Sequence, residues 1–484
     1  MKHPLIDQFE RYQQDFSRRT FLKRSFAGIG GMALSQLLGA GSSSSLPFLQ
    51  SQGGLHFPAR AKRIVHLCMA GGPSHLESFD PKPQLDALHG KPFPASFTAG
   101  QQLAQLQGSQ LIARGSFTKF KKWGESGIEI SELFPHIGSI ADEICVVRSM
   151  VTEQINHDPA HAFMNSGSIL KGRPSMGSWL LYGLGAESQN LPGYVVMVSR
   201  GEGADQPISA RQWSSGFLPS KFQGVQFQSK GSAVHYVGSP DGVCQSTQRQ
   251  VIDEIQRLNG VLKEERLDPE IETRISQYEM AFRMQSSVPE LSDMGDEPQH
   301  ILDMYGVKQP GDGSFASNCL LARRMLERGV RFVQLYHRGW DHHSGIEKGM
   351  PASAKLTDQP SAALVRDLKQ RGLLEDTLVI WGGEFGRTPM VETNPTLGRS
   401  MGRDHHPSAF TIWMAGGGIK GGQSYGATDD LGYHIVDRPV HVHDVQATIL
   451  HCLGLDHERL TYLHAGRHFR LTDVHGNVVK DLLT

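Results

Sequence analysis

The chain has 484 residues, of which 38% are hydrophobic and 20% are charged, and 48 basic residues nearly balance 49 acidic ones. This length is enough to bury a large core, and the balanced charge argues against a nucleic-acid groove or a basic membrane-binding surface. We therefore expect no nucleic-acid partner. Histidine is the unusual residue, with 23 copies, many of them beside Asp or Gly.

The N-terminus carries an export signature. Residues 17–23 read Ser-Arg-Arg-Thr-Phe-Leu-Lys, the pattern of the twin-arginine route, and a modestly apolar, glycine-rich stretch follows at 26–38. That stretch is too short and too rich in glycine to be a stable transmembrane segment. We predict that residues 1–45 are an export signal and a low-complexity segment, and that the mature protein is periplasmic or part of the cell envelope. The cleavage point is left open.

The first folded element is a buried strand at residues 63–69, which is a short apolar run. Two glycines follow and allow the backbone to turn sharply. Ser74, Glu77 and Asp80 come next, and two interpretations stay open for them. Ser74 is either the N-cap of a helix or, with the acidic residues, part of a functional site.

A second strand is expected at 143–147, and it leads through Ser149 to the sequence N-H-D-P-A-H at 156–161. His157 and His161 are four residues apart, so they share one face if the segment is helical. The Asp-Pro pair between them suits a first helical turn, which places His157 near a helix N-terminus, where anions bind. Isolated histidine pairs at this spacing are more often structural, but the position beyond a strand favours function for His157.

Strands and helices then alternate. Further strands are expected at 191–198, 330–336, 377–381 and 410–414, and amphipathic helices at 317–328, 360–372 and 443–453. Residues from about 200 to 300 are polar and contain a helical pattern at 250–284, which indicates an insertion. The alternation predicts one α/β domain over 63–484, with a mostly parallel sheet flanked by helices.

Three polar motifs follow or lie between these strands. They are Asp341-His342-His343, Glu384 with Arg387, and Asp404-His405-His406. Ligands of open α/β sheets lie beyond the carboxyl ends of the strands, so the motifs are expected to converge. Carboxylates and imidazoles in this number suit one or two divalent ions, zinc first, with manganese, magnesium or calcium if oxygen ligands dominate.

Each motif also has a simpler interpretation. Asp-His pairs cap helices, and Glu384 could simply pair with Arg387, which otherwise is suited to bind an anionic oxygen in a bidentate manner. Because adjacent side chains point apart, His342 and His406 are the weaker candidates in their pairs. The coincidence of three motifs near strand ends favours a metal or anion site.

The sequence resembles the family known as domain of unknown function 1501, which is similar to the alkaline phosphatase and sulfatase superfamily. The resemblance extends from about residue 64 to the C-terminus. It rests on the leader and on the motifs G-G-P-S-H-L-E-S-F-D-P-K-P, N-H-D-P-A-H, G-W-D-H-H, G-G-E-F-G-R-T and G-R-D-H-H-P. It implies an alkaline-phosphatase-like core with insertions.

The resemblance also implies roles for individual residues. Asp341 and His343 would match one metal-binding pair, and Glu384 would replace the Asp of a second. His405, with Asp404 close by, would match a late metal-binding histidine, and Glu77 or Asp80 would stand for the carboxylate after the first strand. The second pair lacks its imidazole here, which leaves one ion or two open.

The sequence differs from the pattern of this superfamily at the catalytic nucleophile. Sulfatases of this superfamily use a modified Cys in C-x-P-S-R, whereas Cys145 is followed by Val-Val-Arg. Ser149, Thr152 and Ser166 are the remaining candidates. We expect a metal-dependent hydrolase of phosphate or sulfate esters acting on an anionic ester or polysaccharide. The metal would be held by Asp341, His343, Glu384, Asp404, His405 and Asp80, with Arg387, His157 and Ser149 as catalytic residues.

Two alternatives remain. One is an exported binding protein that keeps the fold but lacks a working nucleophile. The other is a structural envelope protein whose histidines are merely solvated. The oligomeric state is left open.

Overall fold

The computed structural model describes residues 55–231, 233–234, 244–266 and 269–484. The predicted export signal and low-complexity segment at 1–45 lie outside the described residues. Among the helices that are described, none has the length and apolar character needed to cross a membrane.

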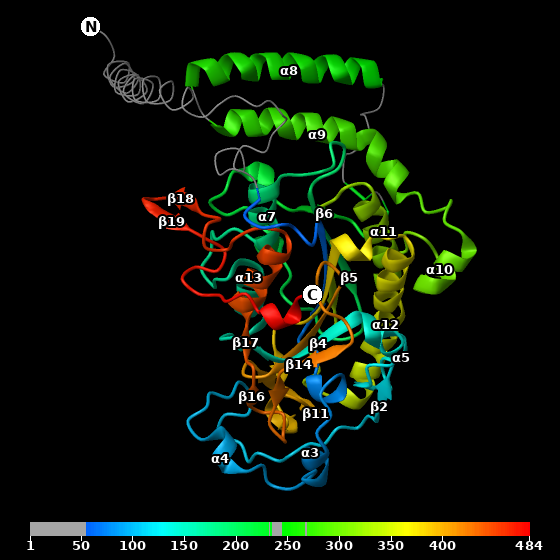
Figure 1. The fold of residues 1–484 in the computed structure, drawn as a ribbon, viewed down its shortest axis with the longest axis vertical. Coiled ribbons are helices and arrows are strands. Elements are labelled where there is room, and N and C mark those ends of the chain that lie inside the picture. The colour runs from blue at the N-terminus through cyan, green and yellow to red at the C-terminus, as the bar shows by residue number, and fades with distance from the viewer. Residues whose placement is uncertain (1–54, 232, 235–243, 267–268) are drawn as a thin grey trace. The chain divides into compact units, whose positions relative to one another are not determined.

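A nine-stranded sheet forms the centre of the described chain (Figure 1). Its strands are β1 (Arg63–Ala70), β4 (Ile144–Val151), β5 (Tyr194–Arg200), β6 (Val225–Phe227), β7 (Phe332–Arg338), β8 (Thr377–Gly382), β13 (Phe410–Ala415), β14 (Gln423–Tyr425) and β17 (Val440–His441). The order is β14-β4-β13-β8-β1-β7-β5-β6, and β17 also pairs with β4. The sheet is the mostly parallel one that the sequence predicts.

Only β13 among these strands runs in the opposite direction. It is antiparallel to both of its neighbours, β4 and β8, whereas every other pair in the sheet is parallel. The carboxyl ends of β1, β4, β5, β7 and β8 therefore lie on one edge of the sheet. The amino end of β13 lies on that same edge.

Helices cover both faces of the sheet (Figure 1). They include α5 (Pro135–Gly138), α6 (His157–Ser166), α7 (Met176–Leu184), α11 (Phe315–Glu327), α12 (Ile346–Gln370) and α13 (Val442–Cys452). Val65, Leu67 and Met69 of β1 pack in the hydrophobic core with α5, α11 and α12. His66 between them points to the opposite face, where it lines a small cavity with residues of α6, α7 and α13. This alternation is the period of a strand buried on both sides.

The helical pattern of the polar region resolves into two helices. They are α8 (Gln245–Arg266) and α9 (Pro269–Ser292), which lie side by side (Figure 1). Arg249 on α8 pairs with Glu279 on α9 at 2.9 Å. The helix expected at 360–372 is the second half of α12, which contains Pro351 and Pro360 within its length.

A polar network is buried between the sheet and α6. His66 on β1 is the register partner of Gln334 on β7, and the Gln334 amide donates to His66 Nδ1 at 3.2 Å and to Asn165 Oδ1 at 2.6 Å. The Tyr194 hydroxyl donates to Gln334 Oε1 at 2.7 Å. Burial, with the nearby charge of His161, lowers the pKa of His66 to about 4. His66 is therefore neutral in the folded protein at neutral pH.

This burial predicts how acid affects stability. Because the pKa of His66 falls from 6.5 unfolded to about 4 folded, the stability that neutral His66 supports is present above pH 6.5 and is lost as the pH falls towards 4. His66→Gln keeps an acceptor for Gln334 but has no proton to take up. The wild type should lose about 2 kcal/mol more than this variant between pH 6.5 and pH 5, measured by urea unfolding. Equal losses would contradict the assignment.

Candidate metal centre

The predicted motifs meet at the edge formed by the strand ends. Asp341 and His343 follow β7, Glu384 follows β8, and His157 begins α6 after β4. His405 reaches this edge because β13 runs antiparallel to its neighbours. The segment that precedes β13 therefore lies at the edge where the segments that follow β7 and β8 lie. A short antiparallel pair, β9 (Gly386–Arg387) with β12 (His405–His406), holds that segment in register.

Three ligand atoms converge at the centre of the cluster. Asp341 Oδ1 lies 3.1 Å from His343 Nε2 and 3.3 Å from His405 Nε2. The two Nε2 atoms are 2.9 Å apart. All three side chains are largely buried.

The partners of the two imidazoles assign their tautomers. His405 Nδ1 lies 2.7 Å from the carbonyl oxygen of Ile155, which only accepts hydrogen bonds, so Nδ1 carries the hydrogen. His343 Nδ1 likewise donates to the Glu392 carboxylate. Burial lowers the pKa of His405 to about 3, so its ring is neutral. With each Nδ1 committed as a donor, the two Nε2 atoms face each other beside the Asp341 carboxylate, and imidazole nitrogens fixed in this way suit a divalent cation.

His157 is the fourth residue of this group. Its Nδ1 lies 2.6 Å from Glu384 Oε1, and its Nε2 lies 3.2 Å from Asp341 Oδ2. Burial would lower the pKa of His157, but hydrogen bonds and charge from Asp341 and Glu384 raise it to about 9. One ligand atom from each of His157, Asp341, His343 and His405 lies within 4.8 Å of the others.

Glu384 supports His157 rather than facing the centre. It is fully buried and accepts the backbone N–H of Gly71 at 3.0 and 3.2 Å. Burial would raise its pKa, but the charge of His161 and the hydrogen bond from His157 hold that pKa at about 2. Gly71 has φ +121°, and a Cβ there would lie 2.4 Å from the Asp341 backbone nitrogen, so only glycine fits.

Arg387 is already occupied and is not an available anion contact. Its guanidinium donates to Asp341 Oδ1 at 2.5 Å, to the carbonyls of Gly72 and Arg403 at 3.0 and 2.9 Å, and to the carbonyl of Gly71. It is 1% exposed. Burial would raise the pKa of Asp341, but Arg387 and the surrounding histidines hold it well below its ordinary value. Arg387 therefore positions Asp341.

Asp404 organises the loop next to the centre. Its carboxylate accepts backbone N–H groups from Gln105 at 2.6 Å, Leu106 at 3.0 Å and His405 at 2.9 Å. A second group of potential ligands joins Asp404 to His343 and Glu392. The first group is the better metal site, because three of its ligand atoms lie within 3.3 Å of one another.

Two predicted site residues are not brought to the cluster. Asp80 pairs with Lys82 at 3.0 Å and accepts the Thr428 hydroxyl, and it belongs to neither group of potential ligands. The Ser149 hydroxyl donates to the carbonyl of Arg438 at 2.6 Å. Neither residue contacts a member of the ligand group.

The other uncertain residues are also engaged elsewhere. Glu77 forms a buried ion pair with Arg403 at 2.5 Å, so this carboxylate after the first strand is structural. His342 Nε2 lies 3.3 Å from the Ser353 hydroxyl, and His406 Nε2 donates to the Tyr433 carbonyl at 2.7 Å. Each adjacent histidine pair thus turns one ring towards the centre and one away.

Sequence reasoning missed Glu392. It lies in β10 (Glu392–Asn394), a short strand of a separate hairpin, and follows no strand of the main sheet. It is fully buried and also pairs with Arg399 at 3.0 Å. Burial would raise its pKa, but His343 and Arg399 hold the pKa below its ordinary value. Its one sequence signal is its place between two histidine motifs.

Residues 61–483 match the family model described as protein of unknown function (DUF1501). The chain belongs to this family. No curated protein matches this DUF1501 protein. Solved structures similar to it include the PsFucS1 sulfatase from Pseudoalteromonas sp., with 14% identity, a TM-score of 0.35, and coverage of 90% of this chain and 74% of that one.

Two further structures lie in the same range. One is a protein in the alkaline phosphatase superfamily from Vibrio parahaemolyticus, with 10% identity, a TM-score of 0.34, and coverage of 83% of this chain and 68% of that one. The other is alkaline phosphatase from the Antarctic bacterium TAB5, with 10% identity, a TM-score of 0.34, and coverage of 81% and 98%. The family match agrees with the resemblance of the sequence to this family.

The position of Arg387 leads to a stability prediction. Arg387→Met should cost about 3–5 kcal/mol, because it leaves the buried Asp341 carboxylate without its cation and several carbonyls without a donor. Arg200→Met is the control, since Arg200 is 66% exposed and pairs with Asp205, and it should cost under about 1 kcal/mol. Chemical denaturation in chelator measures both. Unchanged stability with weakened substrate binding would restore Arg387 as an anion contact.

Proposed function

We propose that this DUF1501 protein is a divalent-metal-dependent hydrolase of phosphate or sulfate esters, exported by the twin-arginine route to the periplasm or cell envelope. One observation carries the proposal. Two imidazoles face each other through their Nε2 atoms at 2.9 Å, beside the Asp341 carboxylate, while each Nδ1 is committed as a donor. A divalent cation held by both Nε2 atoms and the Asp341 carboxylate fits this arrangement.

The donor set fits zinc best. Asp341, His343 and His405 supply one oxygen and two nitrogens, and catalytic zinc sites have three protein ligands and one open position. Manganese, magnesium or calcium would be favoured by a set richer in oxygen. A bound divalent ion would polarise an ester oxygen and offset the charge that develops on it.

The remaining residues bind and orient. His157 stands at the first turn of α6, where backbone N–H groups favour an anion, and Glu384 holds its ring towards the centre. We assign His157 to contact the substrate anion. Glu392 fixes the ring of His343, and Arg387 fixes Asp341, so each ligand has a support behind it.

The second candidate is an exported binding protein on the same fold. The hydroxyls of Ser149 and Ser166 donate to the carbonyls of Arg438 and Ala162, and neither is bonded to the ligand group. Thr152, the third candidate nucleophile, has a buried hydroxyl without a hydrogen-bond partner among the described residues, so hydrolysis proceeds either through Thr152 or by attack of water without a covalent intermediate. Turnover of a generic aryl phosphate or aryl sulfate with the metal bound supports hydrolysis, whereas metal binding without turnover favours the binding protein.

Metal content is the direct test of the centre. The folded protein should hold about one equivalent of zinc or another divalent ion by elemental mass spectrometry, and His343→Ala and His405→Ala should each lose most of it. His342→Gln and His406→Gln are the matched controls, because their rings face away, and they should keep the metal. If wild-type protein holds no metal after incubation with divalent ions, the proposal is wrong.

His157 separates binding of the metal from binding of the substrate. His157→Ala should keep the metal, because three ligands remain, while turnover falls at least tenfold. Circular dichroism checks that the variant is folded. Loss of the metal in this variant would instead make His157 the fourth ligand and close the site to substrate.

Export has its own test. Replacing Arg18 and Arg19 with lysine should hold the precursor in the cytoplasm, which cell fractionation detects. Unchanged export of that variant would argue against the twin-arginine route.

A further inference from the structure

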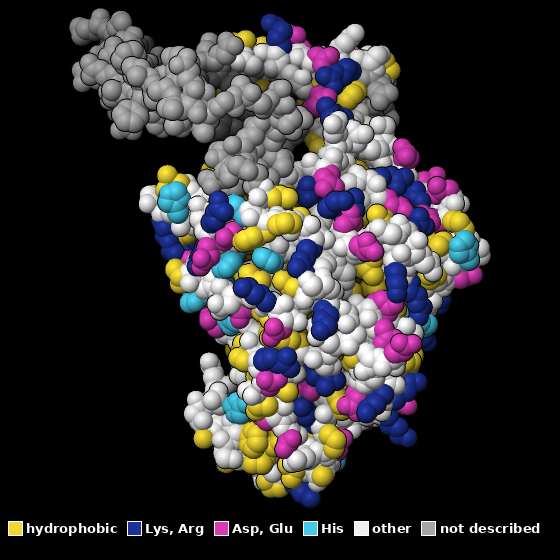
Figure 2. All heavy atoms as spheres, viewed as in Figure 1, with side chains coloured by type: hydrophobic (Ala, Val, Ile, Leu, Met, Phe, Trp, Pro, Cys, Tyr) yellow, Lys and Arg dark blue, Asp and Glu magenta, His cyan; other side chains and the backbone are white. Residues whose placement is uncertain are grey.

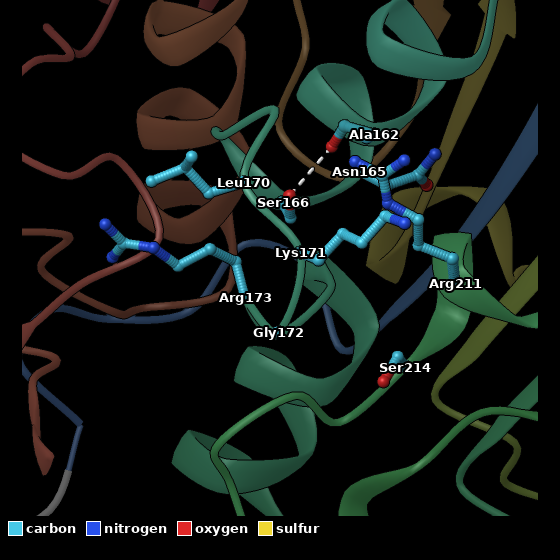
Figure 3. A pocket seen from close by; sticks show the side chains of 9 residues that line it. All are labelled: Ala162, Asn165, Ser166, Leu170, Lys171, Gly172, Arg173, Arg211 and Ser214. Carbon is cyan, nitrogen blue, oxygen red and sulfur yellow. Dashed lines mark hydrogen bonds between the residues drawn. The ribbon is translucent and has the colours of Figure 1, made fainter.

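A pocket of about 330 Å³ lies beside α6 (Figure 3). Its polar lining includes Asn165, Ser166, Lys171, Arg173, Arg211 and Ser214. Figure 3 shows the Lys171 and Arg211 side chains extending towards Asn165, while Arg173 leaves the same loop on its other side.

The pocket has an excess of positive charge. Arg211 pairs with Asp158 at 2.6 Å, but exposed Lys171 makes no ion pair with any residue that the structure describes. Arg173 is 3.9 Å from Asp473, which is also bound by Arg467. The carboxylates around the pocket therefore do not balance its cations. The Ser214 hydroxyl accepts the Gly216 N–H and keeps its own hydrogen to donate to an oxyanion.

The pocket lies close to the candidate metal centre. Arg211 belongs to η3 (Ala210–Trp213), which follows the carboxyl end of β5, and its partner Asp158 is adjacent to His157. Along α6, Ser166 lies about 14 Å from His157 at the rise of an α-helix. One extended ligand can thus reach both the pocket and the centre.

An aromatic surface continues from Arg173. The Arg173 guanidinium lies 4.4 Å from the centre of the Phe469 ring, which is 5.0 Å from the ring of Phe217. Phe217 also stacks on Tyr462, with 15° between the ring planes. Tyr462 and Phe469 belong to a hairpin, β18 (Tyr462–His464) with β19 (Arg467–Phe469). Figure 2 shows hydrophobic, histidine and basic side chains mixed on the surface over this hairpin.

We propose that this pocket is a second anion subsite, which holds a sulfate or phosphate monoester group of a polyanionic saccharide while the aromatic surface contacts its sugar rings. Cationic and hydroxyl donors suit a tetrahedral oxyanion, and half-buried aromatic faces suit the apolar faces of sugars. The inference rests on the proposed function only in that another ester of the same saccharide would lie at the metal centre. Binding at the pocket needs no metal.

The test measures binding to metal-free full-length protein in chelator, at about 0.15 M ionic strength, by isothermal titration calorimetry. The probes are a dextran sulfate oligosaccharide, a dextran phosphate oligosaccharide, neutral dextran and inorganic sulfate. One of the charged oligosaccharides should bind at least tenfold more tightly than neutral dextran and than inorganic sulfate. Whichever of the two binds better identifies the ester. Equal binding of all four probes would overturn the proposal.

Variants locate the binding. Lys171→Glu and the Lys171→Ala, Arg173→Ala double variant should each weaken the charged oligosaccharide at least tenfold. Lys355→Ala, an exposed lysine on α12, is the control and should bind like the wild type. Lys171 is exposed, so its single variant keeps the test valid if the double variant fails to fold. Normal binding of the charged oligosaccharide by Lys171→Glu would overturn the subsite, whether or not the protein is a metal-dependent hydrolase. Because binding is measured in chelator, a protein without metal gives the same test of the subsite.

Discussion

The carboxylate of Asp341 is the charge around which the strand-end edge is arranged. It lies in a largely buried position, where an isolated negative charge is costly, and its neighbours compensate it. The Arg387 guanidinium donates to this carboxylate. His157, His343 and His405 each have a ring nitrogen within 3.3 Å of one of its oxygens. The proposed divalent ion would share that carboxylate with the imidazoles of His343 and His405. These side chains form a group of potential ligands, and Arg387 keeps Asp341 in place.

Several buried acidic residues near the centre hold the candidate ligands, or the loop that carries one of them, by hydrogen bonds. Glu384 orients His157, Glu392 orients His343, and Asp404 ties down the loop that carries His405. Each of these carboxylates accepts hydrogen bonds of its own. Glu384 and Asp404, which the sequence suggests as metal ligands, thus position other candidate ligands instead. One buried carboxylate, Glu77, holds Arg403 instead.

Charge is separated locally although the chain as a whole is nearly neutral. The centre gathers carboxylates and imidazoles, whereas the pocket beside α6 gathers lysine and arginine. The contact of Arg211 with Asp158, the residue next to His157, links the two regions along α6. An anionic chain with several ester groups is the kind of ligand that can use both.

The amino-acid sequence by itself determined the α/β class, the central strands and the candidates Asp341, His343, His405 and His157, because apolar periodicity and polar residues at strand ends are local signals. The family match and the mostly parallel sheet agree with those signals. Only the tertiary structure decided the direction of β13, which brings His405 to the edge from the amino side. It also decided that Arg387 is enclosed, that Asp80 and Ser149 lie elsewhere, and that Glu392 supports His343. These facts depend on contacts between residues far apart in the chain, such as His343 and Glu392, and no local pattern encodes which distant partner a buried charge will find.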